Sequence, residues 1–276
     1  RTAIHILENK PMKYPGMDTI PPVCLTIAGL DPSGGAGIIA DIKTFSAFGC
    51  FPTAAVASVT FQNTQGVFGA VHQTAESVRR QVEPVIDDYS VAALKTGMLP
   101  TREIIDEVAR LIQYFSLQKL VVDPVVRSTS GFDLIDDAAL NSVMDKLFPL
   151  AAVITPNIPE AERIARMQIR SEAEIVKAAG IIRSLGAENV LIKGGHLAGE
   201  TARDFLFLGD IVHIFEEDLI ETKSTHGTGC TLAAAITANL ALGNSLVESV
   251  GISKKFVHEA IRTSPGLGKG NSPINI

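Results

Sequence analysis

Short apolar runs alternate with amphipathic stretches from residue 23 onward, and this alternation constrains the fold more than any other feature of the sequence. Six runs rich in Val, Ile, Leu and Ala predict buried β-strands at residues 23–28, 53–60, 92–94, 120–122, 152–154 and 190–192. Apolar residues three to four positions apart predict helices at 38–48, 103–114, 160–166 and 172–185. Strands separated by helices form right-handed crossovers, so we expect an α/β fold with a mostly parallel sheet covered on both faces.

The chain has 276 residues, which suits one large α/β domain. Residues 11–22 hold four prolines and a glycine, a composition typical of a linker. The first residues lack the sustained apolar core of a secretory signal. We therefore expect residues 1–20 to be an N-terminal extension or linker and residues 21–276 to be a single domain.

The charge and cysteine content exclude several functional classes. The net charge is −6 and the Lys and Arg residues are scattered, whereas a nucleic-acid-binding protein normally carries a concentrated basic stripe. Cys24, Cys50 and Cys230 are far apart and lack CxxC spacing, which argues against a disulfide framework or structural zinc and indicates a reducing, cytoplasmic compartment. No apolar run approaches the roughly 18 residues that span a bilayer. Small molecules are therefore the expected partners, with no nucleic acid and no membrane.

Ligands of open α/β sheets bind beyond the carboxyl ends of the strands, so the segments that follow the apolar runs are the ones to inspect. Residues 35–40 match G-x-G-x-x-A, but residues 58–64 lack the acidic side chain that a dinucleotide site requires about 20 positions later. The sequence contains no GxxxxGK[ST], which excludes a P-loop. Neither common nucleotide-binding motif accounts for the glycines.

A second glycine cluster, at residues 225–230, leads into an Ala-rich stretch of strong helix formers at residues 231–240. Gly227 and Gly229 allow the backbone N–H groups around Thr228 to converge at a helix N-terminus, which forms an anion hole suited to a phosphoryl group. Cys230 lies in the first helical turn, where the helix dipole is expected to lower the thiol pKa and equip it as a general base. The alternative is a turn that packs a helix on the sheet, with Cys230 as a small buried residue.

Polar residues also follow three other predicted strands. Lys193, beside two glycines, can contact a polyphosphate or can be a surface lysine at a turn. Asn157 and Glu160 can hold Mg²⁺ or can form the capping box of the next helix. Asp123 directly follows a buried strand, where a carboxylate serves metal or phosphate chemistry or stabilises a turn. Each signal is weak alone, but their placement at one edge of a parallel sheet favours a phosphotransferase.

Two further positions stay open on pattern alone. Asp41 lies on a predicted helix, with Lys43 nearby, and its pattern predicts an exposed residue. Gln62 and Asn63 follow the second strand and supply amide groups that can pair with the edge of a heterocycle, although amides in a turn usually have no such role.

These segments closely resemble the hydroxymethylpyrimidine/phosphomethylpyrimidine kinases of thiamine biosynthesis. The resemblance runs in order from about residue 22 to the C-terminus and is carried by residues 26–38, 40–45, 62–64, 95–98, 154–157, 193–196 and 225–230. It implies a ribokinase-like three-layer α/β/α sandwich, a homodimer, and two successive phosphorylations of the pyrimidine with ATP and Mg²⁺.

The resemblance also implies roles for individual residues. Asp41 and Gln62 would bind the pyrimidine, and Gly29, Thr60, Met98 and Val125 would line its pocket. Asp123, Asn157, Glu160 and Lys193 would serve Mg·ATP, with Glu160 and Asp123 at the metal. Gly227, Thr228 and Gly229 would form the anion hole, and Cys230 would stand where sugar kinases of this fold place a catalytic Asp.

The sequence departs from the family pattern in the loop after Asp123. Thr129 occupies a position where the family usually has lysine, with Arg127 two residues earlier, which affects closure of the loop or handling of the phosphorylated intermediate. Thr60 stands where an apolar wall is commoner.

Two alternative functions remain at this stage. A pyridoxal kinase of the cysteine-containing branch shares Gly-x-Gly-Cys, but an amide such as Gln62 pairs better with a ring nitrogen and an exocyclic amine than with a pyridinol. A non-catalytic pyrimidine sensor would have no need of Cys230, Lys193, Asp123 and Glu160 together.

Overall fold

A computed structural model describes residues 20–127, 131, 133–194 and 201–276. Apart from Ile20, the expected N-terminal extension lies outside these residues, and so do Thr129 and His196.

The described residues form one nine-stranded sheet with the strand order β3-β2-β1-β4-β5-β6-β7-β8-β9. Six strands are parallel to one another: β1 (Val23–Leu30), β2 (Phe51–Asn63), β4 (Val91–Thr96), β5 (Leu120–Val122), β6 (Ala151–Ile154) and β7 (Asn189–Lys193). Antiparallel strands complete both edges: β3 (Gly66–His72) on one side, and β8 (Thr201–Leu208) and β9 (Ile211–Asp218) on the other. The parallel strands end at the same edge, where the polar segments identified above are located.

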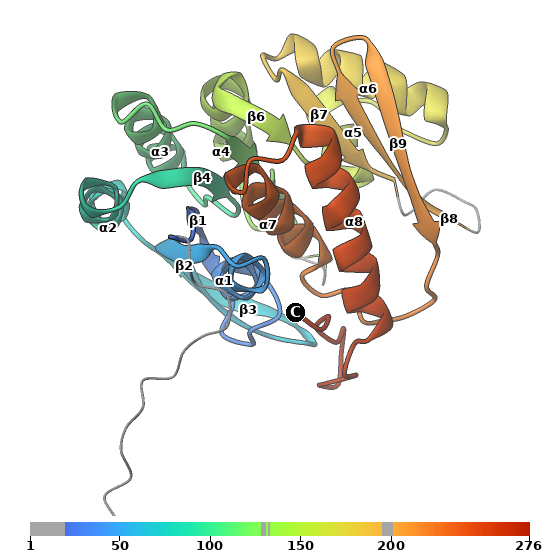
Figure 1. Cartoon of the computed structure of the whole chain (residues 1–276), viewed down its shortest axis with the longest axis horizontal. Helices are drawn as coiled ribbons and strands as arrows, with labels where there is room; N and C mark the ends of the chain where they lie inside the picture. Colours follow the sequence, from blue (N-terminus) through green and yellow to red (C-terminus); the bar gives the residue numbers. More distant parts are fainter. Residues whose placement is uncertain (1–19, 128–130, 132, 195–200) are drawn as a thin grey trace, which may run out of the picture.

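Helices cover both faces of the sheet (Figure 1). One layer consists of α1 (Gly37–Ala47), α7 (Thr228–Ala241) and α8 (Leu246–Arg262). The other consists of α2 (Ala75–Asp88), α3 (Arg102–Tyr114), α4 (Asp137–Ser142), α5 (Ile158–Ala165) and α6 (Glu172–Ser184). The α/β class and the three-layer sandwich are therefore confirmed.

The core follows from the two-residue period of the strands. In β1, Leu25 and Ile27 are fully buried in the apolar cluster under α2 to α6. Cys24, on the opposite face, is buried with Phe45 of α1 and Ala234 of α7. Because successive side chains point to opposite faces, a continuous apolar run is what a strand covered on both sides requires.

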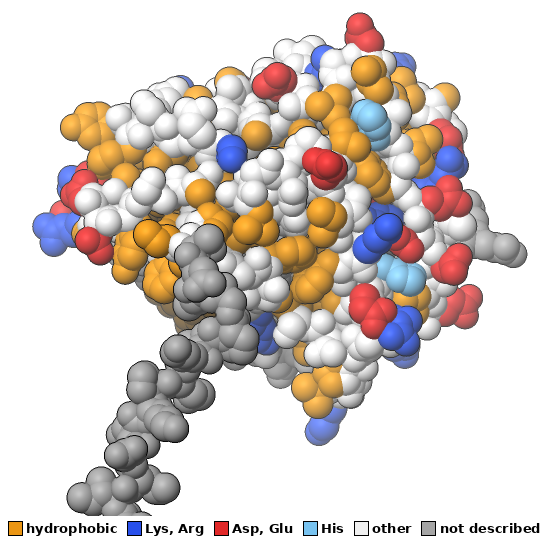
Figure 2. Space-filling model, in the orientation of Figure 1, with side chains coloured by type: hydrophobic (Ala, Val, Ile, Leu, Met, Phe, Trp, Pro, Cys, Tyr) orange, Lys and Arg blue, Asp and Glu red, His pale blue; other side chains and the backbone are white. Residues whose placement is uncertain are grey.

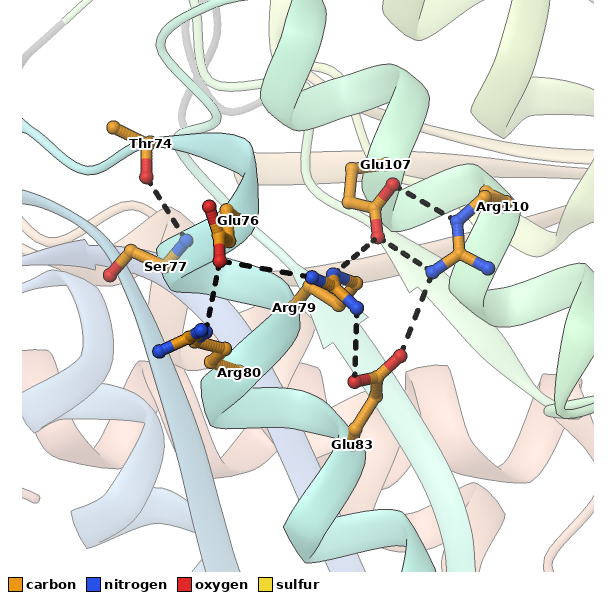
Figure 3. A network of polar contacts seen from close by, with 8 residues as sticks. All are labelled: Thr74, Glu76, Ser77, Arg79, Arg80, Glu83, Glu107 and Arg110. Atoms are coloured by element: carbon orange, nitrogen blue, oxygen red, sulfur yellow. Dashed lines mark hydrogen bonds and ion pairs between the residues drawn. The ribbon is translucent and has the colours of Figure 1, made fainter.

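An exposed charge network connects α2 and α3 (Figure 3). Thr74 caps α2 by accepting a hydrogen bond from the Ser77 N–H. Arg79 of α2 lies 3.6 Å from Glu83 and 3.8 Å from Glu107 of α3. Exposed pairs of this kind typically contribute only about 0–1 kcal/mol each, so apolar packing holds these helices on the sheet.

On the α8 side of the molecule, basic and acidic side chains are interspersed, whereas hydrophobic and uncharged groups cover the middle of this view (Figure 2). Among the described residues, no helix has the length and apolar character that crossing a membrane requires.

Candidate active site

A cavity of about 1130 Å³ opens at the carboxyl ends of the parallel strands. It is large enough for a nucleotide and a second small molecule, because typical ligand pockets measure about 300–1,000 Å³. Of the fourteen residues proposed from the sequence, thirteen line it: Gly29, Thr60, Gln62, Met98, Asp123, Val125, Asn157, Glu160, Lys193, Gly227, Thr228, Gly229 and Cys230. Asp41 is the exception.

The glycine cluster begins α7, as the sequence predicts. Gly227 is the N-cap of the helix and has φ = 87°, a left-handed conformation that favours glycine. A Cβ there would lie 1.8 Å from the carbonyl oxygen of Gly35, so the two glycine loops are in direct backbone contact. The first N–H groups of a helix have no intrahelical acceptor. The residues that carry these groups in α7, Thr228 to Cys230, line the cavity. This geometry is that of an anion-binding site.

Asp31 and His226 link these two loops, and neither was identified as functional from the sequence. His226 Nε2 lies 2.8 Å from Asp31 Oδ2, which also accepts a hydrogen bond from the Ala36 N–H at 2.9 Å. Burial tends to raise the pKa of Asp31, but hydrogen bonds from His226 and Ser33 outweigh it and hold the pKa below its ordinary value. Both side chains line the cavity, and their contact connects the first glycine loop to the start of α7.

Lys193 ends β7 and reaches the start of α7. Its Nζ donates to Asp123 Oδ1 at 3.2 Å and would lie 3.3 Å from a Cβ on Gly229. Burial tends to lower the pKa of Lys193, but the Asp123 and Glu160 carboxylates raise it above its ordinary value. A cation is therefore held beside the anion hole, which is the position from which a lysine can contact a phosphate.

Asn157 and Glu160 form the capping box that the sequence left as an alternative. The Asn157 side chain accepts from the Glu160 N–H at 2.9 Å, and Glu160 Oε2 accepts from the Asn157 N–H at 2.8 Å. Both residues also line the cavity. Burial, together with the Asp123 carboxylate, raises the pKa of Glu160 to about 7, although Lys193 opposes the shift. Capping thus occupies one carboxylate oxygen without removing the side chain from the site.

The donors at this position fit Mg²⁺. Two carboxylates, Asp123 and Glu160, repel each other at the cavity wall, and a hard divalent cation would relieve that repulsion. No cluster of three or more His, Cys, Asp or Glu side chains suited to a metal occurs within the described ranges. Mg²⁺ is usually held by one or two carboxylates together with substrate phosphates and water, a requirement that Asp123 and Glu160 can meet.

The expected lowering of the Cys230 pKa is wrong. Part of the Cys230 surface is open to the cavity, but burial in the surrounding protein raises its pKa to about 12. The Lys95 ammonium and a hydrogen bond from the Gly37 N–H act in the opposite direction, while Asp123 and Asp41 add to the increase. Burial disfavours the charged thiolate, and this desolvation is the largest cause of the increase.

Lys95 is a further cavity residue to which the sequence analysis gave no role. It is fully buried, and its Nζ donates to Asp41 Oδ2 at 3.0 Å. Burial tends to lower its pKa, but Asp41 and Cys230 raise it above the ordinary value, so Lys95 carries a charge in the cavity wall. The sequence did contain a signal for this role, because Lys95 directly follows the apolar run at residues 92–94.

Asp41 is buried, in contrast to the exposed position that its helical pattern predicts. Its Oδ2 accepts hydrogen bonds from Thr26 Oγ1 at 2.6 Å and from Lys95, whereas Oδ1 has no partner among the described residues. Burial raises its pKa. Asp41 is therefore not part of the cavity lining but is paired with Lys95, which is; the direct pyrimidine contact implied by the resemblance stays a prediction.

The cavity is also lined by residues at or just after the carboxyl ends of β1, β2 and β4, namely Gly29, Thr60, Gln62 and Met98. A bulge in β2 between Phe61 and Gln62 redirects Gln62, which lines the cavity. Asn63, by contrast, accepts a hydrogen bond from the Gln65 N–H at 2.8 Å and stabilises the turn, so only one of the two amides is in the cavity wall. Thr60 donates to the Leu30 carbonyl at 3.0 Å, which satisfies the hydroxyl that departs from the expected apolar wall.

Gly29 and Met98 meet at the adjacent wall, where a Cβ on Gly29 would lie 3.0 Å from the Met98 sulfur. Arg127 lies at the cavity edge and pairs with Asp133 at 2.8 Å.

Residues 31–275 match the phosphomethylpyrimidine kinase family. The hydroxymethylpyrimidine/phosphomethylpyrimidine kinase of Bacillus subtilis is 42% identical over 252 residues, which cover 91% of this chain and 93% of the relative. The phosphomethylpyrimidine kinase of Clostridium difficile has a similar structure, with 41% identity and a TM-score of 0.77 over 87% of this chain and 99% of that one. An ADP complex of Bacillus subtilis pyridoxal kinase superposes with a TM-score of 0.87 at 35% identity, covering 93% and 97% of the two chains. On the extent of these matches, the chain belongs to the phosphomethylpyrimidine kinase family.

Proposed function

We propose that this protein uses ATP to phosphorylate 4-amino-5-hydroxymethyl-2-methylpyrimidine and then its monophosphate, which yields the diphosphate used in thiamine biosynthesis. One observation carries the proposal: a single cavity joins the Gln62 amide to the anion hole at the start of α7 and to Lys193. In a chain of this family, that arrangement supports the proposal, because one cavity could accommodate both a heterocycle and a transferring phosphoryl group.

The acceptor end recognises the ring by shape and by one amide. Gln62 carries a donor and an acceptor, which complement an exocyclic amine and an adjacent ring nitrogen. Gly29 and Met98 supply an adjoining wall, in which the absence of a side chain on Gly29 lets the Met98 sulfur approach closely. These contacts would orient the hydroxymethyl group toward α7.

The phosphoryl end stabilises charge. In the transfer, the acceptor oxygen forms a bond to the γ-phosphorus, the bond from phosphorus to the ADP oxygen breaks, and the hydroxyl proton leaves. The N–H groups at Gly227 to Gly229 and the Lys193 ammonium would hold the phosphoryl oxygens. Asp123 and Glu160 would hold Mg²⁺, which supplies charge neutralisation of the phosphates when bound.

Cys230 would receive the hydroxyl proton. Its high pKa means that the thiol is protonated at rest, so this role requires the thiolate to be stabilised as the site fills. The Lys95 ammonium is the described group that favours the thiolate most strongly, since it is the largest influence lowering the Cys230 pKa.

Pyridoxal is the second candidate acceptor, because a solved pyridoxal kinase superposes closely on this chain. A coupled assay of ATP consumption with each acceptor separates the two. We expect turnover of hydroxymethylpyrimidine to exceed that of pyridoxal. Robust turnover of pyridoxal with none of hydroxymethylpyrimidine would contradict the assignment.

A homodimer and a cytoplasmic location remain predictions. Exposed apolar side chains on the β2–β3 hairpin support the dimer: Phe61, Phe68 and Val71 are 51%, 70% and 53% exposed. Sedimentation at micromolar concentration would test it.

A further inference from the structure

A glycine-rich segment after α8 contacts the β2–β3 turn, two residues after Gln62, and also His226 of the cavity wall, and the proposed mechanism gives it no role. We call residues 264–273, which include Gly266, Gly268 and Gly270, the C-terminal glycine loop. Beyond it, the Asn275 N–H donates to the Ala260 carbonyl of α8 at 3.0 Å, and this contact anchors the end of the loop to the helix.

One end of the loop holds the turn between β2 and β3. The N–H groups of Lys269 and Gly270 both donate to Thr64 Oγ1 at 3.2 Å, and the Asn271 N–H donates to the Thr64 carbonyl at 2.8 Å. Thr64 is half-buried although its neighbours Asn63 and Gln65 are exposed. It therefore accepts three hydrogen bonds from a segment about 200 residues away in sequence.

The fit at this contact requires glycine. A Cβ on Gly268 would lie 2.3 Å from Thr64 Oγ1, and one on Gly270 would lie 2.0 Å from the Thr64 carbonyl oxygen. Gly268 also has φ = 83°, a left-handed conformation. Any larger residue at position 268 or 270 would therefore collide with Thr64, and position 268 also needs the left-handed backbone that glycine adopts most easily.

The other end of the loop holds the segment that enters α7. The His226 N–H donates to the Ser272 carbonyl at 3.2 Å, and His226 pairs with Pro273 in a short parallel bridge. Pro273 also packs against Gly35, on which a Cβ would lie 3.0 Å from the proline Cβ. His226 directly precedes Gly227, the N-cap of α7.

We infer that Thr64 is a positioning residue for phosphoryl transfer. In this inference, the C-terminal glycine loop fixes the distance between Gln62, which precedes the β2–β3 turn, and the anion hole at the start of α7. Asn271 bonds to Thr64 while its neighbour Ser272 bonds to His226, so consecutive residues connect the β2–β3 turn to the segment that enters α7. The inference rests on the proposed function, in which Gln62 holds the acceptor. Reacting atoms must meet within about 3–3.5 Å, so a shift of one end relative to the other lowers kcat.

The test compares Thr64→Val with Thr64→Ser. Valine has nearly the same shape as threonine but cannot accept from Lys269 and Gly270, whereas serine keeps the hydroxyl. Thr74→Val is the matched control, because Thr74 Oγ1 also accepts a backbone N–H, at 3.0 Å, but lies on α2 away from the cavity. All three variants are measured for Tm, kcat and the KM of each substrate.

Thr64→Val is expected to lower kcat/KM for hydroxymethylpyrimidine by about tenfold or more, with the KM for ATP changed far less. Thr64→Ser should restore values near the wild type, and Thr74→Val should lower Tm alone. If Thr64→Val loses Tm as the control does but keeps its kinetic constants, Thr64 has only a structural role and the inference is wrong.

Amide hydrogen exchange provides a readout that does not depend on which small molecule the protein phosphorylates. Loosening of the loop in Thr64→Val should accelerate exchange at the His226 N–H as well as at Lys269 and Gly270. Faster exchange confined to 269–270 would contradict the inference. A wild-type protein that fails to phosphorylate hydroxymethylpyrimidine would instead refute the proposed function, while the exchange at His226 would still decide the role of Thr64.

Discussion

Replacing Glu160 with glutamine should stabilise the protein above neutral pH while impairing catalysis. Glu160 is only 6% exposed, and burial beside Asp123 raises its pKa to about 7. Glutamine keeps an oxygen that can accept from the Asn157 N–H, so the capping interaction survives while the charge is removed.

The magnitude follows from proton linkage. Between pH 4.5, the ordinary value for Glu, and about 7, the folded state holds a proton that the unfolded state has released. The stability of the wild type therefore falls as the pH rises through this window, and the full cost is present above pH 7. A shift of about 2.5 pH units corresponds to about 3 kcal/mol, which is the upper limit expected for the gain of Glu160→Gln at pH 8.

Urea denaturation in metal-free buffer with EDTA, at pH 4.5 and pH 8, would measure this gain. Glu248→Gln is a matched control, because Glu248 occupies the same position in the capping box of α8 with Ser245 but is exposed and has a lowered pKa. The control should gain nothing. If Glu160→Gln is no more stable than the wild type at pH 8, the charged Glu160 carboxylate does not destabilise the folded protein and the reasoning is refuted. Loss of Mg²⁺-dependent turnover in the same variant would fit a trade of stability for function.

Two further variants test the start of α7. Cys230→Ala should lower kcat by about 10²–10⁴-fold with pyrimidine binding retained in calorimetry, and unchanged turnover would remove Cys230 from the mechanism. If the pKa of Cys230 stays near 12 with substrates bound, kcat of the wild type should also rise about tenfold per pH unit between pH 7 and 9. Gly227→Ala should lower both Tm and kcat, because a Cβ there would collide with the Gly35 carbonyl. Gly49→Ala, which has φ = 75° but open space around its Cβ, should lower Tm by a smaller amount and keep full activity, and equal effects of the two would contradict a specific contact between the loops.

The central strands and four of the helices could be predicted because each depends on local pattern, whereas α2, α4 and α8 were not predicted. All six predicted strands and all four predicted helices are present, and β5 has the predicted bounds. The edge strands β3, β8 and β9 were not predicted, since they pair antiparallel at the margins of the sheet and lack the uniform apolar runs of central strands.

The site could be predicted in outline because parallel strands end at one edge, which brings the segments after them together. The burial and the charged neighbours of individual side chains could not be predicted. The burial of Asp41 depends on Lys95, 54 residues away, and nothing local indicates that contact. The dipole at the start of α7 is a local property, whereas the desolvation that raises the Cys230 pKa comes from the tertiary structure. For the same reason, Thr64 and the C-terminal glycine loop could not be connected from sequence alone.

The most direct test of the proposed activity is mass analysis of the products formed from hydroxymethylpyrimidine, ATP and Mg²⁺. The proposal predicts a monophosphate that appears first and is then converted to the diphosphate. A protein that binds the pyrimidine without forming either product, or that phosphorylates only pyridoxal, would contradict it.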